Sequence, residues 1–296
     1  MYKRSLTRGE RRLAILCGTC AWADHEKFYP QSVKPTDRLE YYARFFPIVE
    51  VDSSYYAIPA ARTVQEWVNR TPNHFRFDVK VYKSLTRHTK QNQEIAVEED
   101  VVKMHEAIRP LRESGKLGAV LFQFPPWFVF REENAEYLKK VRDWFHDDLV
   151  AIEFRHRSWW MDGERTEDTL RWLRDHEFVN VVCDEPQVGM GTIPLIPNVT
   201  NPSCVVFRLH GRNERMWYEK GLKSSSQRFN YKYSVAELTQ LSSYVQQWAK
   251  ASADVHVLMN NNQGDYAVTN AFDWLSILDL GVRERPRQRG VQGRLF

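Results

Sequence analysis

Short apolar runs alternate with segments of helical periodicity along this chain. Segments with a helical pattern lie at 37–46, 63–70, 96–114, 132–145, 167–176, 235–249 and 266–278. Between them are eight runs that have the length and composition of buried strands, at 13–18, 48–53, 75–81, 117–124, 149–154, 179–183, 204–209 and 255–259. One connection differs, because 185–203 holds four prolines and no helical period. We expect an irregular loop there.

This alternation of strand and helix favours a single (β/α)8 TIM barrel. An open doubly wound sheet is the alternative, but it would have a glycine-rich phosphate turn after an early strand, and Gly-Thr-Cys-Ala-Trp at 18–22 is not one. We therefore predict a barrel domain over 13–281 with an irregular connection between its sixth and seventh strands. A polar N-terminal arm, 1–12, precedes it, and a basic flexible tail, 282–296, follows.

Charge is concentrated in that tail. The 296 residues carry a formal net charge of +4, and 282–296 alone hold five arginines against one glutamate, so the rest of the chain is formally neutral. No apolar run approaches the length of a membrane span and the first residues are polar, which predicts a cytoplasmic protein without a membrane partner. The four cysteines contain one Cys-x-x-Cys pair, at 17–20, without a second pair to complete a zinc site. We expect reduced, buried thiols.

In a TIM barrel, functional side chains lie at the C-terminal ends of the strands and in the loops that follow. The fifth predicted strand ends in Glu-Phe-Arg-His at 153–156, and alternation along a strand puts Glu153 and Arg155 on the same side. A guanidinium beside Glu153 favours its ionised form. The pair is either the centre of an active site or a structural ion pair that closes the barrel.

Polar side chains follow six other strand ends as well, so we predict one shared site. The predicted catalytic residues are Asp52, His88, Glu153, Arg155, Asp184 and His210. The predicted substrate-binding residues are Trp22, Glu50, Lys80, Gln123, Trp159, Arg208, Arg212 and Asn260. Several of these are metal-ligand types, but no local spacing is typical of a metal motif, so we favour a metal-free pocket over a divalent-metal site and leave the cofactor open.

The loop after the seventh strand interleaves cations with aromatic rings. Its cations are Arg212, Arg215, Lys220, Lys223, Arg228 and Lys232, and its aromatic residues are Trp217, Tyr218, Phe229, Tyr231 and Tyr233. Such a loop could follow a phosphate backbone and stack bases, which makes nucleic acid a candidate partner. The alternative is that the rings bury to anchor a long loop.

Together the sequence motifs at the strand ends resemble those of the YecE-like family of TIM-barrel proteins, a domain of unknown function. The similarity spans roughly 13–280 and includes Val-Glu-Val-Asp-Ser-Ser-Tyr-Tyr at 49–56, Gln-Phe-Pro-Pro at 123–126, Glu-Phe-Arg-His at 153–156 and Arg-Leu-His-Gly-Arg at 208–212. The resemblance implies the barrel independently of the strand pattern. It implies no reaction, although the family's barrel is similar to those of apurinic-site endonucleases and sugar isomerases.

The last five residues, Gln-Gly-Arg-Leu-Phe at 292–296, look like the peptide with which many bacterial replication and repair proteins bind the sliding clamp. Gln292 would supply an amide, and Leu295 and Phe296 two apolar anchors, to a preformed groove. We therefore predict the clamp as a candidate partner.

Three functions remain open at this stage. The leading hypothesis is a DNA-associated enzyme that acts on a phosphodiester or nucleotide moiety, with Glu153 and Asp52 or Asp184 activating a nucleophile. Arg155, Arg208 and Lys80 would stabilise phosphate charge, and His210 or His88 would transfer a proton. The alternatives are a non-catalytic nucleic-acid-binding module and an enzyme that acts on a sugar or sugar phosphate.

Overall fold

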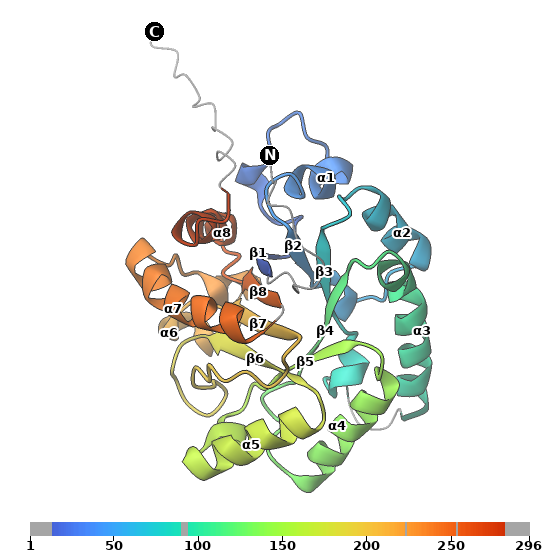
Figure 1. The fold of residues 1–296 in the computed structure, drawn as a ribbon, viewed down its shortest axis with the longest axis vertical. Coiled ribbons are helices and arrows are strands. Elements are labelled where there is room, and N and C mark those ends of the chain that lie inside the picture. Colours follow the sequence, from blue (N-terminus) through green and yellow to red (C-terminus); the bar gives the residue numbers. More distant parts are fainter. Residues whose placement is uncertain (1–13, 90–93, 223, 253, 282–296) are drawn as a thin grey trace.

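A computed structural model of the protein describes residues 14–89, 94–222, 224–252 and 254–281. Eight parallel strands close into a barrel in chain order (Figure 1). The strands are β1 (Ala14–Cys20), β2 (Ile48–Val51), β3 (Arg76–Lys80), β4 (Leu117–Gln123), β5 (Leu149–Glu153), β6 (Val179–Asp184), β7 (Cys204–Leu209) and β8 (Asp254–Met259). The predicted fold class is confirmed. The arm, 1–12, and the tail, 282–296, with its Gln292, Leu295 and Phe296, lie outside the described residues.

Helices surround the barrel and cover the outer faces of its strands (Figure 1). They are α1 (Arg38–Tyr42), α2 (Ala61–Asn69), α3 (Glu94–Glu113), α4 (Glu132–Trp144), α5 (Gly163–Asp175), α7 (Val235–Ala251) and α8 (Tyr266–Ile277). The short helix α6 (Glu214–Trp217) lies in the loop after β7. The connection from β6 to β7 contains neither helix nor strand, as its prolines predict.

Helix α6 was not predicted, and two of the predicted helices differ from the prediction by four residues at one end. Helix α1 is only five residues long, because its expected last turn, 43–46, tightens into i→i−3 hydrogen bonds, from the N–H of Arg44 to Tyr41 and from the N–H of Phe45 to Tyr42. Helix α5 begins at Gly163, earlier than predicted, because the carboxylate of Asp162 accepts a hydrogen bond from the backbone N–H of Arg165. That cap satisfies one of the free N–H donors at the helix start. The prediction relied on the spacing of apolar residues, which does not reveal a capping residue.

Strand register brings polar side chains to one level at the C-terminal end of the barrel, its mouth. Cys20 pairs with Glu50, Gln123 with Glu153 and Cys183 with Arg208. Close contact between β1 and β2 depends on Gly18, because a Cβ there would lie 2.1 Å from the carbonyl oxygen of Ile48. Buried apolar side chains make up most of the core, and the polar pair Asp78 and His256 is buried among them.

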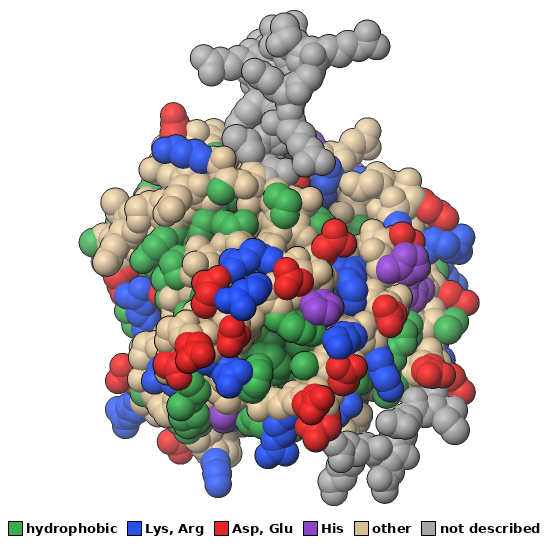
Figure 2. All heavy atoms as spheres, turned by 60° about the horizontal axis from the view of Figure 1, so that its bottom comes forward, with side chains coloured by type: hydrophobic (Ala, Val, Ile, Leu, Met, Phe, Trp, Pro, Cys, Tyr) green, Lys and Arg blue, Asp and Glu red, His purple; other side chains and the backbone are tan. Residues whose placement is uncertain are grey.

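The exposed surface carries charges of both signs. Figure 2 shows acidic and basic side chains interspersed on the face turned forward, around a hollow that contains hydrophobic side chains. A continuous basic stripe is not present on that face. Among the helices of the described ranges, none combines the length and apolar character needed to cross a bilayer.

Candidate active site at the barrel mouth

Five buried side chains of alternating charge cross the mouth in the order Glu50, Arg208, Glu153, Arg155, Glu185, which we call the charged chain. Arg208 donates to both oxygens of Glu50, from Nε over 2.8 Å and from Nη2 over 2.6 Å. Its Nη1 bonds to Glu153 Oε2. Arg155 Nη1 lies 3.0 Å from Glu153 Oε1 and 3.0 Å from Glu185 Oε2. The predicted pairing of Glu153 with Arg155 is confirmed.

The charged chain contains three carboxyl groups and two guanidinium groups, so its central acid and its terminal acids have different numbers of cationic neighbours. Burial would raise the pKa of Glu153, but Arg208, His210 and Arg155 together hold it well below its usual range. Each terminal acid has one guanidinium, and burial raises the pKa of Glu50 to about 8 and that of Glu185 to about 7. Glu153 is therefore the permanently ionised centre, and the ends can hold a proton.

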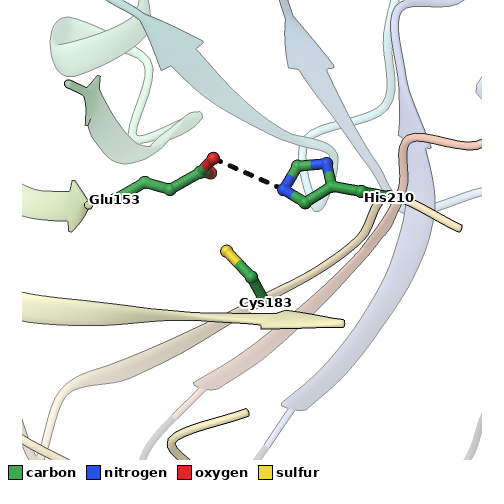
Figure 3. A group of neighbouring side chains, drawn as sticks. All are labelled: Glu153, Cys183 and His210. Carbon is green, nitrogen blue, oxygen red and sulfur yellow. Dashed lines mark ion pairs between the residues drawn. The ribbon is translucent and has the colours of Figure 1, made fainter. Parts of the chain in front are cut away.

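His210 lies beside the centre of the charged chain as a neutral imidazole. Burial lowers its pKa to about 4, although Glu153 opposes this shift. Its Nδ1 is 2.8 Å from Asn260 Nδ2, so it accepts from that amide. Its Nε2 lies 3.4 Å from Glu153 Oε1 and has no hydrogen-bond partner. Figure 3 shows the thiol of Cys183 directed toward the space between these two side chains.

A more accessible edge of the mouth holds Asp52, Lys80 and His88. Lys80 Nζ lies 3.7 Å from Asp52 Oδ1 and 4.7 Å from the ring centre of Tyr55. Burial, together with the positive charges of Lys80 and Arg155, lowers the pKa of His88 to about 4. Two cations thus act on one imidazole.

His88 also belongs to an aromatic rim, a set of contacting rings formed by Tyr55, Tyr56, His88 and Trp127. The ring centroid of His88 is 5.1 Å from that of Tyr55 and 5.7 Å from that of Trp127. Tyr56 is 67% exposed and Trp127 63% exposed. The sequence prediction missed Tyr56 and Trp127 as site residues, although each follows a strand end.

Asp184 and Arg212, predicted as catalytic and substrate-binding residues, hold the loop after β7. Arg212 Nε donates to Asp184 Oδ1 over 2.9 Å and its Nη2 to Oδ2 over 2.7 Å. The hydroxyl of Tyr233 donates to Oδ1 over 2.6 Å. Asp184 is therefore occupied by two loop side chains.

Three further predicted substrate-binding residues, like Lys80, Arg212 and Asn260, make no side-chain hydrogen bond to the charged chain within the described structure. Trp22 packs edge-to-face against Trp67, with ring centroids 5.4 Å apart. Trp159 is 2% exposed and stacks on Phe154 at 4.0 Å. Gln123 pairs in register with Glu153 and is partly exposed.

The aromatic residues of the loop after β7 fold mainly onto the mouth. Trp217 is buried beneath Arg155, whose guanidinium lies 5.0 Å from its ring centre. Phe229 lies 5.9 Å from the His210 ring. Tyr231 donates to Glu237 of α7 over 2.5 Å, while Tyr218 remains 55% exposed. The loop's rings thus act largely as anchors, the alternative left open by the sequence.

Two groups of metal-ligand side chains lie at the mouth within the described structure. One consists of Glu153, Cys183 and His210, and the other of Cys20, Glu50 and Asp52. All four cysteines are buried and unpaired, as predicted. The sequence analysis placed Glu153 and His210 at one shared site but missed Cys183, because the three side chains come from β5, β6 and the residue after β7.

Fold and site together define a (β/α)8 barrel protein with a buried, alternating ionic network at its C-terminal mouth. The chain belongs to the DUF72 family, whose model, described as "Protein of unknown function DUF72", matches residues 16–291. The match continues beyond 281 into the segment predicted as a tail.

Relatives and solved structures agree with this assignment. UPF0759 protein YunF of Bacillus subtilis is 36% identical over 269 residues, which are 90% of this chain and 95% of YunF. UPF0759 protein YecE of Escherichia coli K12 is 26% identical over 152 residues, 51% of this chain and 53% of YecE.

A DUF72 family crystal structure from Enterococcus faecalis V583 superimposes with a TM-score of 0.84 at 35% identity, covering 93% of this chain and 99% of that one. One from Thermotoga maritima MSB8 gives 0.76 at 33% identity, with 90% and 99% covered. The predicted YecE-like resemblance is confirmed.

Proposed function

We propose that this protein is an enzyme that binds a phosphate-bearing ligand, a nucleotide or a phosphodiester of DNA, at the accessible edge of the mouth. One observation carries the proposal: Lys80 and Arg155 both act on His88, whose ring contacts those of Tyr55 and the exposed Trp127. A ligand that matches this arrangement has an anionic group joined to a flat ring.

The cations supply the anion-binding part of the site. Lys80 is a flexible point charge, whereas Arg155 is fixed by Glu153, Glu185 and the Trp217 ring. Arg208 is 1% exposed and bonded on both sides, so its role is to hold Glu153 and, through it, Arg155. The charged chain therefore preorganises a guanidinium for phosphate.

His88 is better suited than Glu153 to transfer a proton. Thr86 Oγ1 lies 3.2 Å from the carbonyl oxygen of Lys83 and 2.8 Å from His88 Nδ1. When the hydroxyl donates to that carbonyl, it accepts from Nδ1–H, and His88 Nε2 is left as a proton acceptor. A bound phosphate would raise the pKa of His88 by opposing the nearby cations.

Binding of three probes tests the ligand class: adenosine 5′-monophosphate, ribose 5-phosphate and adenosine, measured by calorimetry. We expect the nucleotide to bind tightest. Trp127→Ala should weaken it by the equivalent of about 1–3 kcal/mol through lost stacking. Lys80→Ala should weaken both phosphates but not adenosine. Lys103→Ala, at an exposed position of α3, is the matched control and should change nothing.

The outcomes separate the ligand classes. If ribose 5-phosphate binds as tightly as the nucleotide and Trp127→Ala has no effect, the sugar-phosphate alternative replaces our proposal. If neither phosphate binds the folded protein, the phosphate site is wrong.

Turnover is tested with labelled single- and double-stranded oligonucleotides. The wild type should release a product, and alanine at Glu153, Arg155 or His210 should abolish it, with circular dichroism confirming the fold. Salt-dependent binding without a product would instead establish the non-catalytic binding module.

A further inference from the structure

Three potential metal ligands from neighbouring strand ends lie close together at the centre of the charged chain. Glu153 ends β5, Cys183 lies on β6 and His210 directly follows β7, and one ligand atom from each lies within 4.8 Å of the others. All three side chains are buried. In Figure 3 the carboxylate, the thiol and the imidazole point toward a common space.

We propose that Glu153, Cys183 and His210 form a binding site for a borderline-soft divalent cation, with Zn²⁺ as the best match. His210 is 1% exposed, and its Nε2 has no hydrogen-bond partner although it points at Glu153. A buried nitrogen without a partner is costly, and a metal ion would satisfy it. This inference goes beyond the proposed function and does not depend on it.

Spacing and ligand type agree with zinc. Bonds of 2.0–2.1 Å in a tetrahedral site place nitrogen and oxygen ligands roughly 3.4 Å apart. His210 Nε2 and Glu153 Oε1 are already 3.4 Å apart. Oε1 also accepts from Arg155, but a carboxylate oxygen has two lone pairs and one remains for the metal. A mixed nitrogen, oxygen and sulfur set favours zinc over magnesium or calcium.

Charge balance points the same way. When all its acids are ionised, the charged chain carries one negative charge in surplus, because three carboxylates face two guanidiniums. A Zn²⁺ ion with a deprotonated Cys183 adds one net positive charge, since the thiol loses a proton on binding. With Glu50 and Glu185 both ionised, a bound metal ion would therefore bring the charged chain to zero net charge.

Asn260 is placed to orient the ligand histidine. Metal on Nε2 requires the proton on Nδ1, which lies 2.8 Å from the Asn260 amide. The amide would present Oδ1 instead of Nδ2 to that proton, giving the outer-sphere bond that zinc-bound histidines make. The second ligand group is less suitable because Arg208 Nη2 lies 3.7 Å from Cys20 Sγ and Lys80 neighbours Asp52. It also contains no histidine.

The test is titration of the full, metal-stripped protein with Co²⁺ and Zn²⁺. Wild type should bind one Co²⁺ per chain with a near-ultraviolet thiolate-to-cobalt band, lose that band when Zn²⁺ displaces cobalt, and release about one proton per metal at neutral pH. Cys183→Ser and His210→Gln should each weaken binding by at least the roughly 10–100-fold typical of a lost outer-sphere partner. Cys17→Ser, at an equally buried thiol of β1, is the matched control and should retain the band.

Because the wild-type band and proton release need no variant, the proposal stays testable even if a substitution prevents folding. No binding to the folded wild type would overturn it. So would a band that survives Cys183→Ser, or one that disappears in Cys20→Ser instead. Metal binding without any phosphate affinity would leave this site standing and remove the proposed function.

Discussion

Glu153 and Glu185 carry the same carboxyl group, yet their neighbours shift their pKa values in opposite directions. Two guanidiniums and His210 hold the pKa of Glu153 well below its usual range despite its burial. Glu185 has one guanidinium, so burial raises its pKa to about 7. The sequence predicted an ionised Glu153 from Arg155 alone, but it missed Glu185, which neighbours Asp184 just beyond the strand.

A second buried pair, inside the barrel, makes stability depend on pH. Burial opposes charge on His256, but Asp78 Oδ2, 2.9 Å from its Nδ1, raises the pKa of His256 well above its usual 6.5. A raised folded-state pKa stabilises the protein below the unfolded pKa, and this contribution is lost as pH rises through the folded pKa.

We therefore expect the wild type's stability advantage over His256→Asn to shrink above pH 6.5. The loss should be about 1.4 kcal/mol for each pH unit between the two pKa values. Urea unfolding at several pH values measures it, with His146→Asn at an exposed site as control. A constant difference from roughly pH 6 to 9 would contradict the assignment.

Among the elements, α7 fixes the position of the loop that closes the mouth. Ser234 and Glu237 form a capping box at its start. Glu237 also accepts from Tyr231 and lies 3.4 Å from Arg212, which in turn binds Asp184. The helix start and the mouth are therefore linked through one carboxylate. Sequence periodicity placed α7 correctly, but only the structure shows that link.

Ser234→Ala should lower the free energy of unfolding by about 0.5–2 kcal/mol, because the first turn of α7 loses an acceptor for its free N–H groups. Chemical denaturation measures the change. Ser243→Ala, on the exposed face of the same helix, provides the control and should have a much smaller effect. Equal effects of the two substitutions would show that the cap contributes nothing special.

For the whole molecule, closure of the barrel and the C-terminal tail bear on different properties of the protein. Closure of the barrel brings the side chains of the site together. The tail, 282–296, lies outside the described residues, and its sequence bears on which partner the protein binds. Clamp binding through Gln292, Leu295 and Phe296 remains our proposal, motivated by the sequence of the last five residues.

A pull-down with a bacterial sliding clamp tests that proposal. The intact chain should be recovered, and a variant with Leu295→Ala and Phe296→Ala should not, because both apolar anchors are removed. Arg294→Ala changes a position that the motif leaves free, so its recovery should match the wild type. Equal recovery of all three proteins would exclude clamp docking through this peptide.

The sequence by itself determined the eight strands, the barrel and the shared side of Glu153 and Arg155, because the side-chain alternation of a strand is local. Only the tertiary structure joined Arg208 to Glu50, which are 158 positions apart in the chain. It also decided that Trp159 is buried and Trp127 exposed. Local pattern fixes which way a side chain points from its own strand. Burial, pKa and ligand geometry depend on what the closed barrel and its loops place against it.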